Sequence, residues 1–215
     1  MNEASVRDTK DRILDAAERL VAQQGIFATS LRQITTEAKV NLAAVNYHFQ
    51  SKDDLILAVY RRRIVPMNEE RLALLDELEK IYGGKPIPID EILRVFMEPV
   101  LNLSAKMAQA GIPIGGMLGR LYTEPFDKLM QGFASEMAAT AQRFTKAFRK
   151  TLPHLTQQEV FWRLWFTIGA LMQTVGAAPK LKLISQGACD PENRQQALRQ
   201  MVAYAKAGWE APKAK

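Results

Sequence analysis

Side chains suited to contacting DNA are concentrated between residues 29 and 54, a stretch that reads TSLRQITTEAKVNLAAVNYHFQSKDD. Six residues carry hydroxyl, amide, ring or cationic groups of the kinds that bind phosphate oxygens, namely Ser30, Arg32, Asn41, Tyr47, His48 and Lys52. The candidates for contact with base edges are Leu42, Ala43, Ala44 and Asn46. An Asn amide can pair with adenine, and Leu and Ala can lie against thymine methyl groups. These residue types predict a surface that reads double-stranded DNA.

Two interpretations are open for Tyr47 and His48, because each could instead be partly buried and hydrogen-bonded to nearby backbone. Bulk charge is a weak guide here. The chain carries a net charge of +6, yet its first 63 residues hold ten Lys or Arg against eight Asp or Glu. The placement of the cations is more informative, since Arg32, Lys39 and Lys52 fall in or beside the segment where phosphates would lie.

Helix-capping signals place these side chains on two short helices. Ser30 opens a capping box, which predicts a helix over residues 31–39. Asn41 is the next good cap residue, so a second helix is expected over residues 42–48. A further capping box at Ser51 opens a longer helix. Two short helices joined by a tight turn and followed by a third are typical of a helix-turn-helix.

The same stretch resembles the DNA-binding signature of the TetR family of bacterial transcriptional regulators. The resemblance covers residues 29–34, 38–40, 45–49 and 51–55. The chain departs from the family at the turn, where Lys39 or Val40 stands in place of a common Gly, and at Asn46, where an aromatic residue is common. The resemblance implies a helical regulator with an N-terminal helix-turn-helix, but it does not extend to the operator sequence.

The rest of the chain is expected to be helical. Apolar residues recur at helical spacing along most of its length, and the clearest break is the Gly- and Pro-containing segment 81–89. We expect helices over residues 9–24, 52–80, 90–110, 117–122, 124–150, 157–177 and 190–208. No convincing strand is present. The predicted fold is all-α, with a helix-turn-helix DNA-binding domain over residues 1–52 and a helical ligand-binding and dimerisation domain over residues 53–215.

The long helix that is expected to join the two domains carries two further features. Pro66 removes an amide donor and predicts a kink or a break. The arginine run at residues 61–63 could clamp a phosphate, but we favour a solvated helix face at the domain junction, since the run lies about three turns beyond Lys52. At the other end of the chain, residues 2–8 are polar and are expected to be frayed.

Length and composition limit the class of protein. A chain of 215 residues with 47% hydrophobic content suits one or two compact domains. No run approaches the roughly 18–20 apolar residues of a membrane span, and the N-terminal segment lacks the apolar core of a signal peptide. The single cysteine, Cys189, cannot form an internal disulfide. We therefore expect a cytoplasmic protein that does not associate with a membrane.

A second candidate site lies in the C-terminal half, which is rich in methionine and aromatic residues. Flexible thioethers and flat rings suit an adaptable apolar pocket between helices. The candidate lining residues are Phe96, Met97, Met107, Met117, Met130, Phe133, Met137, Trp165 and Met172. Arg120 and Glu124, beside a Gly-rich turn, are the best candidates for polar anchors. The alternatives are a filled core for the apolar residues and a surface or structural ion pair for the charged ones.

The helix expected over residues 157–177 is apolar around most of its girth. Trp162 and Phe166 add bulk beyond its main stripe, so we expect it to be buried on two sides. The apolar stripe of the last helix consists of Leu198, Met201, Val202, Ala205 and Trp209. We expect these two helices to pack against their copies as a four-helix bundle, which is also where the family resemblance places dimerisation. A monomer that buries both faces internally is the alternative.

These features predict a ligand-responsive transcriptional repressor that acts as a homodimer. Two recognition helices about 34–36 Å apart would reach successive major grooves, which implies a near-palindromic operator. A small apolar or amphipathic effector would release the DNA by binding better to another conformation. The C-terminal half resembles the PsrA-like endings of the family, and that resemblance implies a fatty-acid or acyl-thioester effector.

An enzyme is not expected. A di-iron carboxylate bundle needs Glu-x-x-His pairs, whereas His48 and His154 are preceded three residues earlier by Val45 and Thr151. The sequence has no Gly-rich phosphate loop, zinc-spaced Cys/His set or nucleophile elbow, so no cofactor or metal is expected. The alternative function is a helical carrier of apolar ligands, or an adaptor, that keeps the fold without binding an operator.

Overall fold

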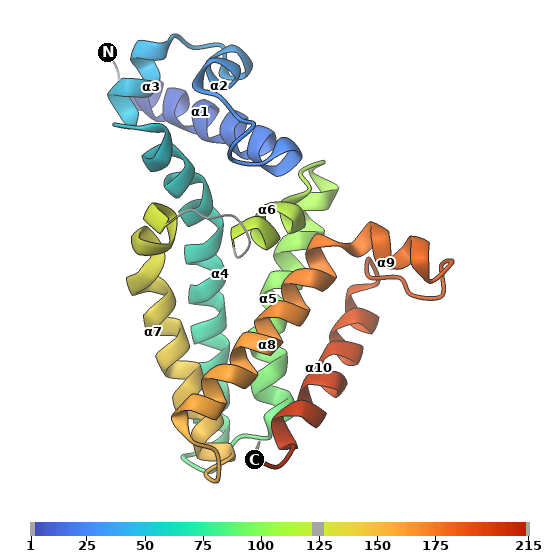
Figure 1. Cartoon of the computed structure of the whole chain (residues 1–215). Helices are drawn as coiled ribbons and strands as arrows, with labels where there is room; N and C mark the ends of the chain where they lie inside the picture. Colours follow the sequence, from blue (N-terminus) through green and yellow to red (C-terminus); the bar gives the residue numbers. More distant parts are fainter. Residues whose placement is uncertain (1–2, 122–126, 214–215) are drawn as a thin grey trace.

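The computed structural model describes the backbone of residues 3–121 and 127–213, and within these ranges every regular element is an α-helix (Figure 1). Side chains are described for residues 8–119, 131–132 and 137–213. The helices are α1 (Glu3–Gln24), α2 (Leu31–Ala38), α3 (Leu42–His48), α4 (Lys52–Tyr82), α5 (Ile89–Gln109), α6 (Ile114–Leu121), α7 (Asp127–Thr151), α8 (Gln157–Gly176), α9 (Ala178–Ile184) and α10 (Arg194–Glu210). The all-α prediction is confirmed.

Local capping explains the two short helices of the N-terminal unit. The Ser30 hydroxyl accepts the Gln33 main-chain N–H at 3.2 Å, and the Gln33 side chain accepts the Ser30 N–H at 2.8 Å. Asn41 Oδ1 accepts the Ala44 N–H at 2.8 Å. Between the two helices the chain turns at Lys39, whose backbone is left-handed, with φ 54° and ψ 48°. Both short helices that the caps predict are confirmed.

Helix α1 supplies the core on which α2 and α3 rest. Its buried side chains include Ile13, Ala17 and Val21. They belong to the same core as Ile34 of α2 and Val45 of α3, both of which are fully enclosed. α1 begins at residue 3 rather than at residue 9, because the residues between them include no Gly or Pro that would end a helix. The predicted helix start at residue 9 is therefore wrong.

Helix α4 runs from the N-terminal unit into the C-terminal one and is the longest element, with 31 residues (Figure 1). It continues through Pro66, so the break allowed by the sequence does not occur. The side chains on both sides of the proline are packed, with Ile64 5% exposed and Met67 9% exposed. Burial of its neighbours holds this part of α4 in place although the proline lacks an amide donor.

The arginine run of α4 is bonded within the protein, which corrects the expectation of a solvated face. Arg62 Nη1 lies 2.5 Å from Asp15 Oδ1, and Arg63 donates to both carboxylate oxygens of Glu18 at 2.5 and 2.7 Å. Glu18 is 1% exposed, and its hydrogen bond raises the pKa of Arg63 above the ordinary arginine value. Arg61 donates to a main-chain carbonyl of α7 at 2.7 Å. The run therefore fastens both α1 and α7 to α4.

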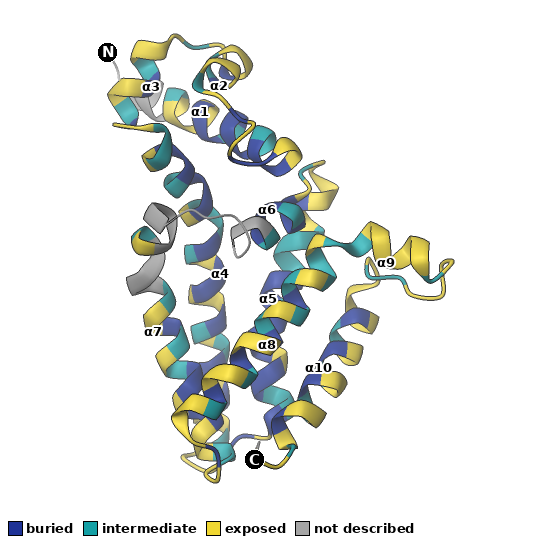
Figure 2. Cartoon of the chain, viewed as in Figure 1, coloured by how far each residue is buried: buried dark blue, intermediate teal, exposed yellow. Residues whose placement is uncertain are grey.

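The C-terminal unit is a bundle of α4, α5, α7, α8 and α10, whose buried residues belong to one core (Figure 2). α10 begins after Asn193, whose amide oxygen accepts a main-chain N–H of α10 at 3.2 Å. Asp190, where this helix was expected to begin, instead accepts the Glu192 N–H at 3.2 Å and forms a turn before the helix. The short helix α9, opened by a Pro in its first turn, occupies a segment expected to be a connection.

Helix α6 crosses α8 with backbone close to backbone. A Cβ atom at Gly115 would overlap the main-chain carbonyl of Val175, and one at Gly176 would lie 3.2 Å from the Gly115 carbonyl oxygen. On its other side α6 accepts a hydrogen bond at 3.0 Å from the buried Tyr60 hydroxyl to the Met117 carbonyl. α6 also packs against α1, so it lies between the N-terminal unit and α8 (Figure 1).

We expect Arg63→Met to destabilise the fold, because it leaves the Glu18 carboxylate buried without its partner. The expected cost is about 3–5 kcal/mol in the free energy of unfolding, measured by urea denaturation. The matched control is Arg94→Met, which removes an exposed i,i+4 pair with Glu98 and should cost under about 0.5 kcal/mol. Similar losses in the two variants would contradict the assignment of Arg63 to a buried ion pair.

We expect Lys39→Gly to stabilise the protein by roughly 1 kcal/mol, because glycine adopts the left-handed conformation without the Cβ penalty that lysine incurs. The same denaturation measurement applies. Lys39→Ala is the control, since it removes the charge and keeps the Cβ atom, and it should leave the stability nearly unchanged. An equal gain from both substitutions would point to charge rather than to backbone conformation.

Candidate nucleic-acid interface and apolar cavity

Helix α3 presents the predicted base-contact residues on one outward face. The exposed side chains of this face are Leu42, Ala43, Asn46 and Tyr47. Leu42 is 52% exposed and Tyr47 is 68% exposed, so both large side chains are accessible at the surface. Ala44 is half-buried at the edge of the face, and Val45 points into the core. The surface is a capped helix that offers apolar groups and one amide to a groove.

The predicted phosphate donors fall into two groups. Arg32 is exposed and, like Lys39 at the turn, makes no ion pair with any residue that the structure describes. Ser30 and Asn41 use their side-chain oxygens for capping. Lys52 is half-buried, and its Nζ donates to the main-chain carbonyl of Ile26 at 2.8 Å. Lys39 is therefore a more accessible cation than Lys52. Lys39 falls in the segment where phosphates would lie, although it is not among the candidate phosphate donors predicted from the sequence.

Tyr47 and His48 differ in their surroundings. The exposed Tyr47 does not fit the partly buried alternative. His48 is half-buried between two rings, with centroid distances of 5.0 Å to Tyr47 and 6.2 Å to Phe49. The interpretation of a partly buried side chain therefore fits His48 better than it fits Tyr47.

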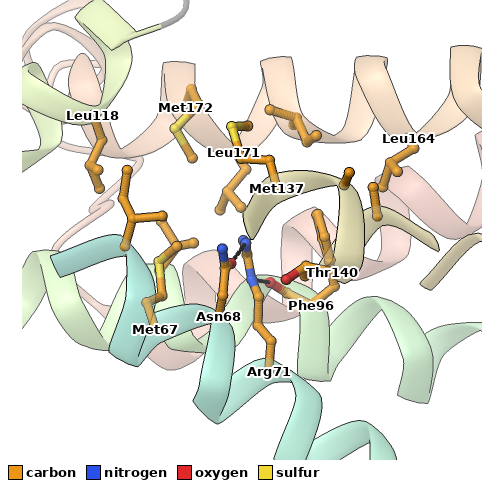
Figure 3. A pocket seen from close by; sticks show the side chains of 15 residues that line it. Met67, Asn68, Arg71, Phe96, Leu118, Met137, Thr140, Leu164, Leu171 and Met172 are labelled. Atoms are coloured by element: carbon orange, nitrogen blue, oxygen red, sulfur yellow. Dashed lines mark hydrogen bonds between the residues drawn. The ribbon is translucent and has the colours of Figure 1, made fainter. Parts of the chain in front are cut away.

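An apolar cavity of about 240 Å³ lies in the C-terminal unit among α4, α5, α6, α7 and α8 (Figure 3). Its apolar lining residues include Ile64, Met67, Phe96, Leu118, Met137, Leu164, Ile168, Leu171 and Met172. Three polar side chains also reach it, namely Asn68, Arg71 and Thr140. A mostly apolar cavity with a few polar groups at defined positions is typical of a small-molecule site.

Asn68 and Arg71 are joined within this wall. Arg71 is 8% exposed; its Nε donates to the Phe96 carbonyl at 2.8 Å, and its Nη1 donates to Asn68 Oδ1 at 3.0 Å. The guanidinium carbon lies 4.3 Å from the centre of the Phe96 ring. The sequence-based search for Met and aromatic residues missed both side chains. The sequence did contain a signal for them, because Asn68 and Arg71 are polar residues on a helical stripe whose other members, Ile64 and Met67, are apolar.

The predicted pocket residues are divided between several places. Phe96, Met137 and Met172 line the cavity, whereas Met107 and Met117 are core residues that do not reach it. Met97 lines a separate groove between α8 and α10. Trp165 is 57% exposed and lines an open hollow that shares Ile168 and Met172 with the cavity. The side chains of Arg120, Glu124, Met130 and Phe133 lie outside the described residues.

Helix α8 exposes a row of large aromatic side chains. Trp162 is 55% exposed and Phe166 is 64% exposed, and their rings stack at a centroid distance of 5.7 Å. Phe161 and Trp165 of the same helix are 45% and 57% exposed, and Tyr204 of α10 is 76% exposed. These residues form an exposed apolar face on a single chain, so the internal-burial alternative does not describe α8.

The predicted interface residues of α10 face mainly inward, which corrects the expected position of that stripe. Met201, Ala205 and Trp209 are buried, and Leu198 and Val202 are half-buried. The Trp209 ring stacks on Phe148 at 3.9 Å, and its indole N–H donates to Thr167 Oγ1 at 2.8 Å. The apolar stripe of α10 covers α5 within the chain, so the residues that remain outward belong to the other side of the helix.

No helix in the described part of the chain is long and apolar enough to cross a membrane. Over the same residues, no group of His, Cys, Asp and Glu side chains gathers in a way that could hold a metal ion.

Comparison with known proteins gives two family matches. Residues 13–59 match the family described as bacterial regulatory proteins, tetR family. Residues 94–208, more than half of the chain, match the family described as tetracyclin repressor-like, C-terminal domain. The first match contains α2, α3 and the start of α4, and the second contains most of the helices that surround the cavity.

Individual relatives match over limited lengths. An HTH-type transcriptional regulator in the dhlA 5′ region of Xanthobacter autotrophicus is 32% identical over 100 residues, which is 41% of this chain and 50% of that protein. The HTH-type nicotine-responsive transcriptional repressor HdnoR of Paenarthrobacter nicotinovorans is 43% identical over 54 residues, 25% of this chain and 28% of that protein. The chain thus spans half or less of the length of these relatives.

A solved structure shares the fold over nearly the whole chain. FadR from Bacillus subtilis, a transcriptional regulator in complex with stearoyl-CoA, superposes with a TM-score of 0.57 at 16% identity and covers 90% of this chain and 97% of that one. An identity this low establishes the common fold alone. The two family matches show that the chain belongs to the TetR family of DNA-binding transcription regulators, which are not enzymes.

Proposed function

We propose that this chain is a ligand-responsive repressor, which binds a near-palindromic operator as a homodimer and leaves it when a small apolar or amphipathic effector occupies the cavity. The observation that carries the proposal is that one helix, α4, serves both sites. Its arginine run holds α1, and its following turns line the cavity with Ile64, Met67, Asn68 and Arg71. We take residues 1–52 as the DNA-binding domain and residues 53–215 as the sensing domain.

The DNA contacts would divide by chemistry. Asn46 would pair with an adenine edge, and Leu42, Ala43 and Ala44 would lie against thymine methyl groups. Arg32, Lys39 and Lys52, with the hydroxyl and ring groups at Ser30, Tyr47 and His48 and the amide of Asn41, would contact phosphates. The exposure of the α3 face and of Arg32 and Lys39 beside it supports this division.

Dimerisation would use the aromatic face of α8 and the outward side of α10. Aromatic residues are enriched at the buried centres of protein interfaces, and this face would otherwise remain in water. A groove of about 300 Å³ between the two helices, lined in part by Phe166 and Tyr204, would receive side chains of the second copy. The dimer would hold the two α3 helices about 34–36 Å apart on one side of B-DNA.

Effector release would follow from a two-state equilibrium. An effector that binds better to a conformation with the wrong spacing of the α3 helices lowers DNA affinity by its differential preference for that state. A fatty acyl group, as an acid or a thioester, is one candidate, and it is supported by the related fold of FadR in complex with stearoyl-CoA. A helical carrier or adaptor remains the second function, distinguished by a lack of sequence-specific DNA binding.

The DNA contacts can be tested with operator fragments enriched by the protein from a genomic pool, measured by fluorescence anisotropy over a salt series. Asn46→Ala should cost about 1–3 kcal/mol and relax the preference at one base pair, while Arg32→Ala should weaken all sequences alike and reduce the salt slope by about 1. Arg199→Ala, an exposed cation of α10, is the control and should change neither. Weak binding that is equal on all fragments would favour the carrier.

The dimer can be tested by placing a charge on the aromatic face. Phe166→Glu should convert the dimer to a monomer in analytical ultracentrifugation and lower the affinity for a palindromic fragment by at least about tenfold, because one recognition helix then acts alone. Ile81→Glu is the matched control, since Ile81 is 75% exposed at the far end of α4. A Phe166→Glu protein that remains dimeric would rule out this face.

A further inference from the structure

The wall of the cavity also indicates the chemistry of what it binds. We infer that the effector is a compact apolar molecule that ends in a hydrogen-bond acceptor, a carboxylate or carbonyl oxygen, which is held by the side-chain amide of Asn68. The inference rests on the proposed function in treating the cavity as the effector site. It goes further by naming the chemical class of the effector and the atoms that would select it.

The orientation of the Asn68 amide is set by its neighbour. Arg71 Nη1 lies 3.0 Å from Asn68 Oδ1. A guanidinium can donate hydrogen bonds but cannot accept them, so the amide must turn its oxygen toward Arg71. Its –NH₂ group is then on the other branch, away from the guanidinium. The part of Asn68 that is wholly free to bind a ligand is therefore its –NH₂ donor.

The amide N–H groups of Asn68 are the part of this side chain without a partner. Asn68 is 7% exposed and lines the cavity, and its one hydrogen bond within the described structure is the bond accepted from Arg71. Figure 3 shows its nitrogen pointing from α4 toward Leu171 of α8. A donor that loses its contact with water and gains no other partner costs free energy, so a ligand that displaces water from Asn68 must bring an acceptor.

The residues around the Asn68 donor narrow the chemical class of the effector further. Met67, Met137 and Met172 offer polarizable, adaptable contacts to an apolar body. The guanidinium of Arg71 supplies positive potential, and no lining residue that the structure describes is acidic. An ammonium would place donors against the Asn68 donors and a positive charge near Arg71. Cationic amphiphiles are therefore excluded from the inferred class, whereas anionic and neutral acceptors fit.

The cavity volume limits the size of the body. A cavity of about 240 Å³ is smaller than the roughly 300–1,000 Å³ of a site for a drug-sized ligand, so the inferred body is compact. We therefore choose four compact probes of similar size. They are hexanoate, 2-heptanone, heptylamine and n-octane, which represent an anionic acceptor, a neutral acceptor, a cationic donor and an apolar molecule.

The test measures binding of these probes to the full-length protein by ligand-detected NMR titration. Hexanoate or 2-heptanone, or both, should bind at least about tenfold more tightly than heptylamine, because only the acceptors satisfy Asn68. A preference for hexanoate would identify an acid as the source of the acceptor, and a preference for 2-heptanone would identify a neutral carbonyl compound. Heptylamine binding as tightly as both acceptors would overturn the inference.

Two substitutions of Asn68 separate its donor from its volume. Asn68→Leu keeps a similar size and removes the donor, so acceptor affinity should fall at least about tenfold while n-octane binding is retained. Asn68→Asp keeps the bond from Arg71 and turns the donor into an acceptor, so it should also lose the acceptor probes. Unchanged acceptor affinity in Asn68→Leu would overturn the inference, and this variant suffices if Asn68→Asp fails to fold.

Arg71 is inferred to act as a positioning residue, and Arg71→Gln tests that role. A glutamine can either donate or accept, so the Asn68 amide becomes able to flip and present its oxygen. The ratio of hexanoate to heptylamine affinity should therefore fall toward one. A purely structural role for Arg71 would weaken all four probes together and leave that ratio unchanged, which would contradict the positioning role.

A DNA-release measurement on the same samples tests this inference separately from the proposed function. Labelled operator DNA is added, and its anisotropy is followed as each probe is titrated. Acceptor probes that bind selectively without releasing DNA would support the inferred ligand class and contradict effector-driven release. Release of DNA by n-octane and heptylamine as readily as by the acceptors would support a ligand-responsive regulator and overturn the inferred class.

Discussion

The attachment of α1 to α4 depends on the ion pair between Arg63 and Glu18. The carboxylate is almost fully buried, so it is stable there only while the guanidinium holds both of its oxygens. Arg62 and Asp15 add a second, more exposed pair on the same two helices. Because α1 in turn supports α2 and α3, the direction in which the DNA-binding face points is fixed relative to α4.

The cavity begins where that attachment ends. Ile64 follows Arg63 directly in the sequence, and Asn68 lies about 7.5 Å further along the helix axis than Arg63. The buried bond from Tyr60 to the Met117 carbonyl ties α6 to the same part of α4. A molecule that presses on Asn68 therefore acts on the helix that carries the DNA-binding unit, a little more than one turn from the point of attachment.

Features encoded within a few residues were predictable, and those that need distant partners were not. Ser30 and Asn41 act through capping bonds to residues three positions away, so both short helices followed from the sequence. The partners of the arginine run lie more than 40 residues away, on α1 and α7, and no local pattern indicates them. Trp209 sits on an apolar stripe that was recognised correctly, but whether that stripe meets α5 or a second chain depends on packing. Asn68 was missed because the search for a pocket used apolar residue types.

The crossing of α6 and α8 at Gly115 has a mechanical consequence. Side-chain contacts can absorb small displacements by changing rotamer, but two backbones in direct contact have no such compliance. Residue 115 lies against the main-chain carbonyl of Val175. A shift of the C-terminal end of α8 is therefore expected to move α6 by nearly the same distance. A side chain at this position would push the two helices apart. The residue type at position 115 is therefore restricted by the close contact of the two backbones, and not by a chemical role of the residue.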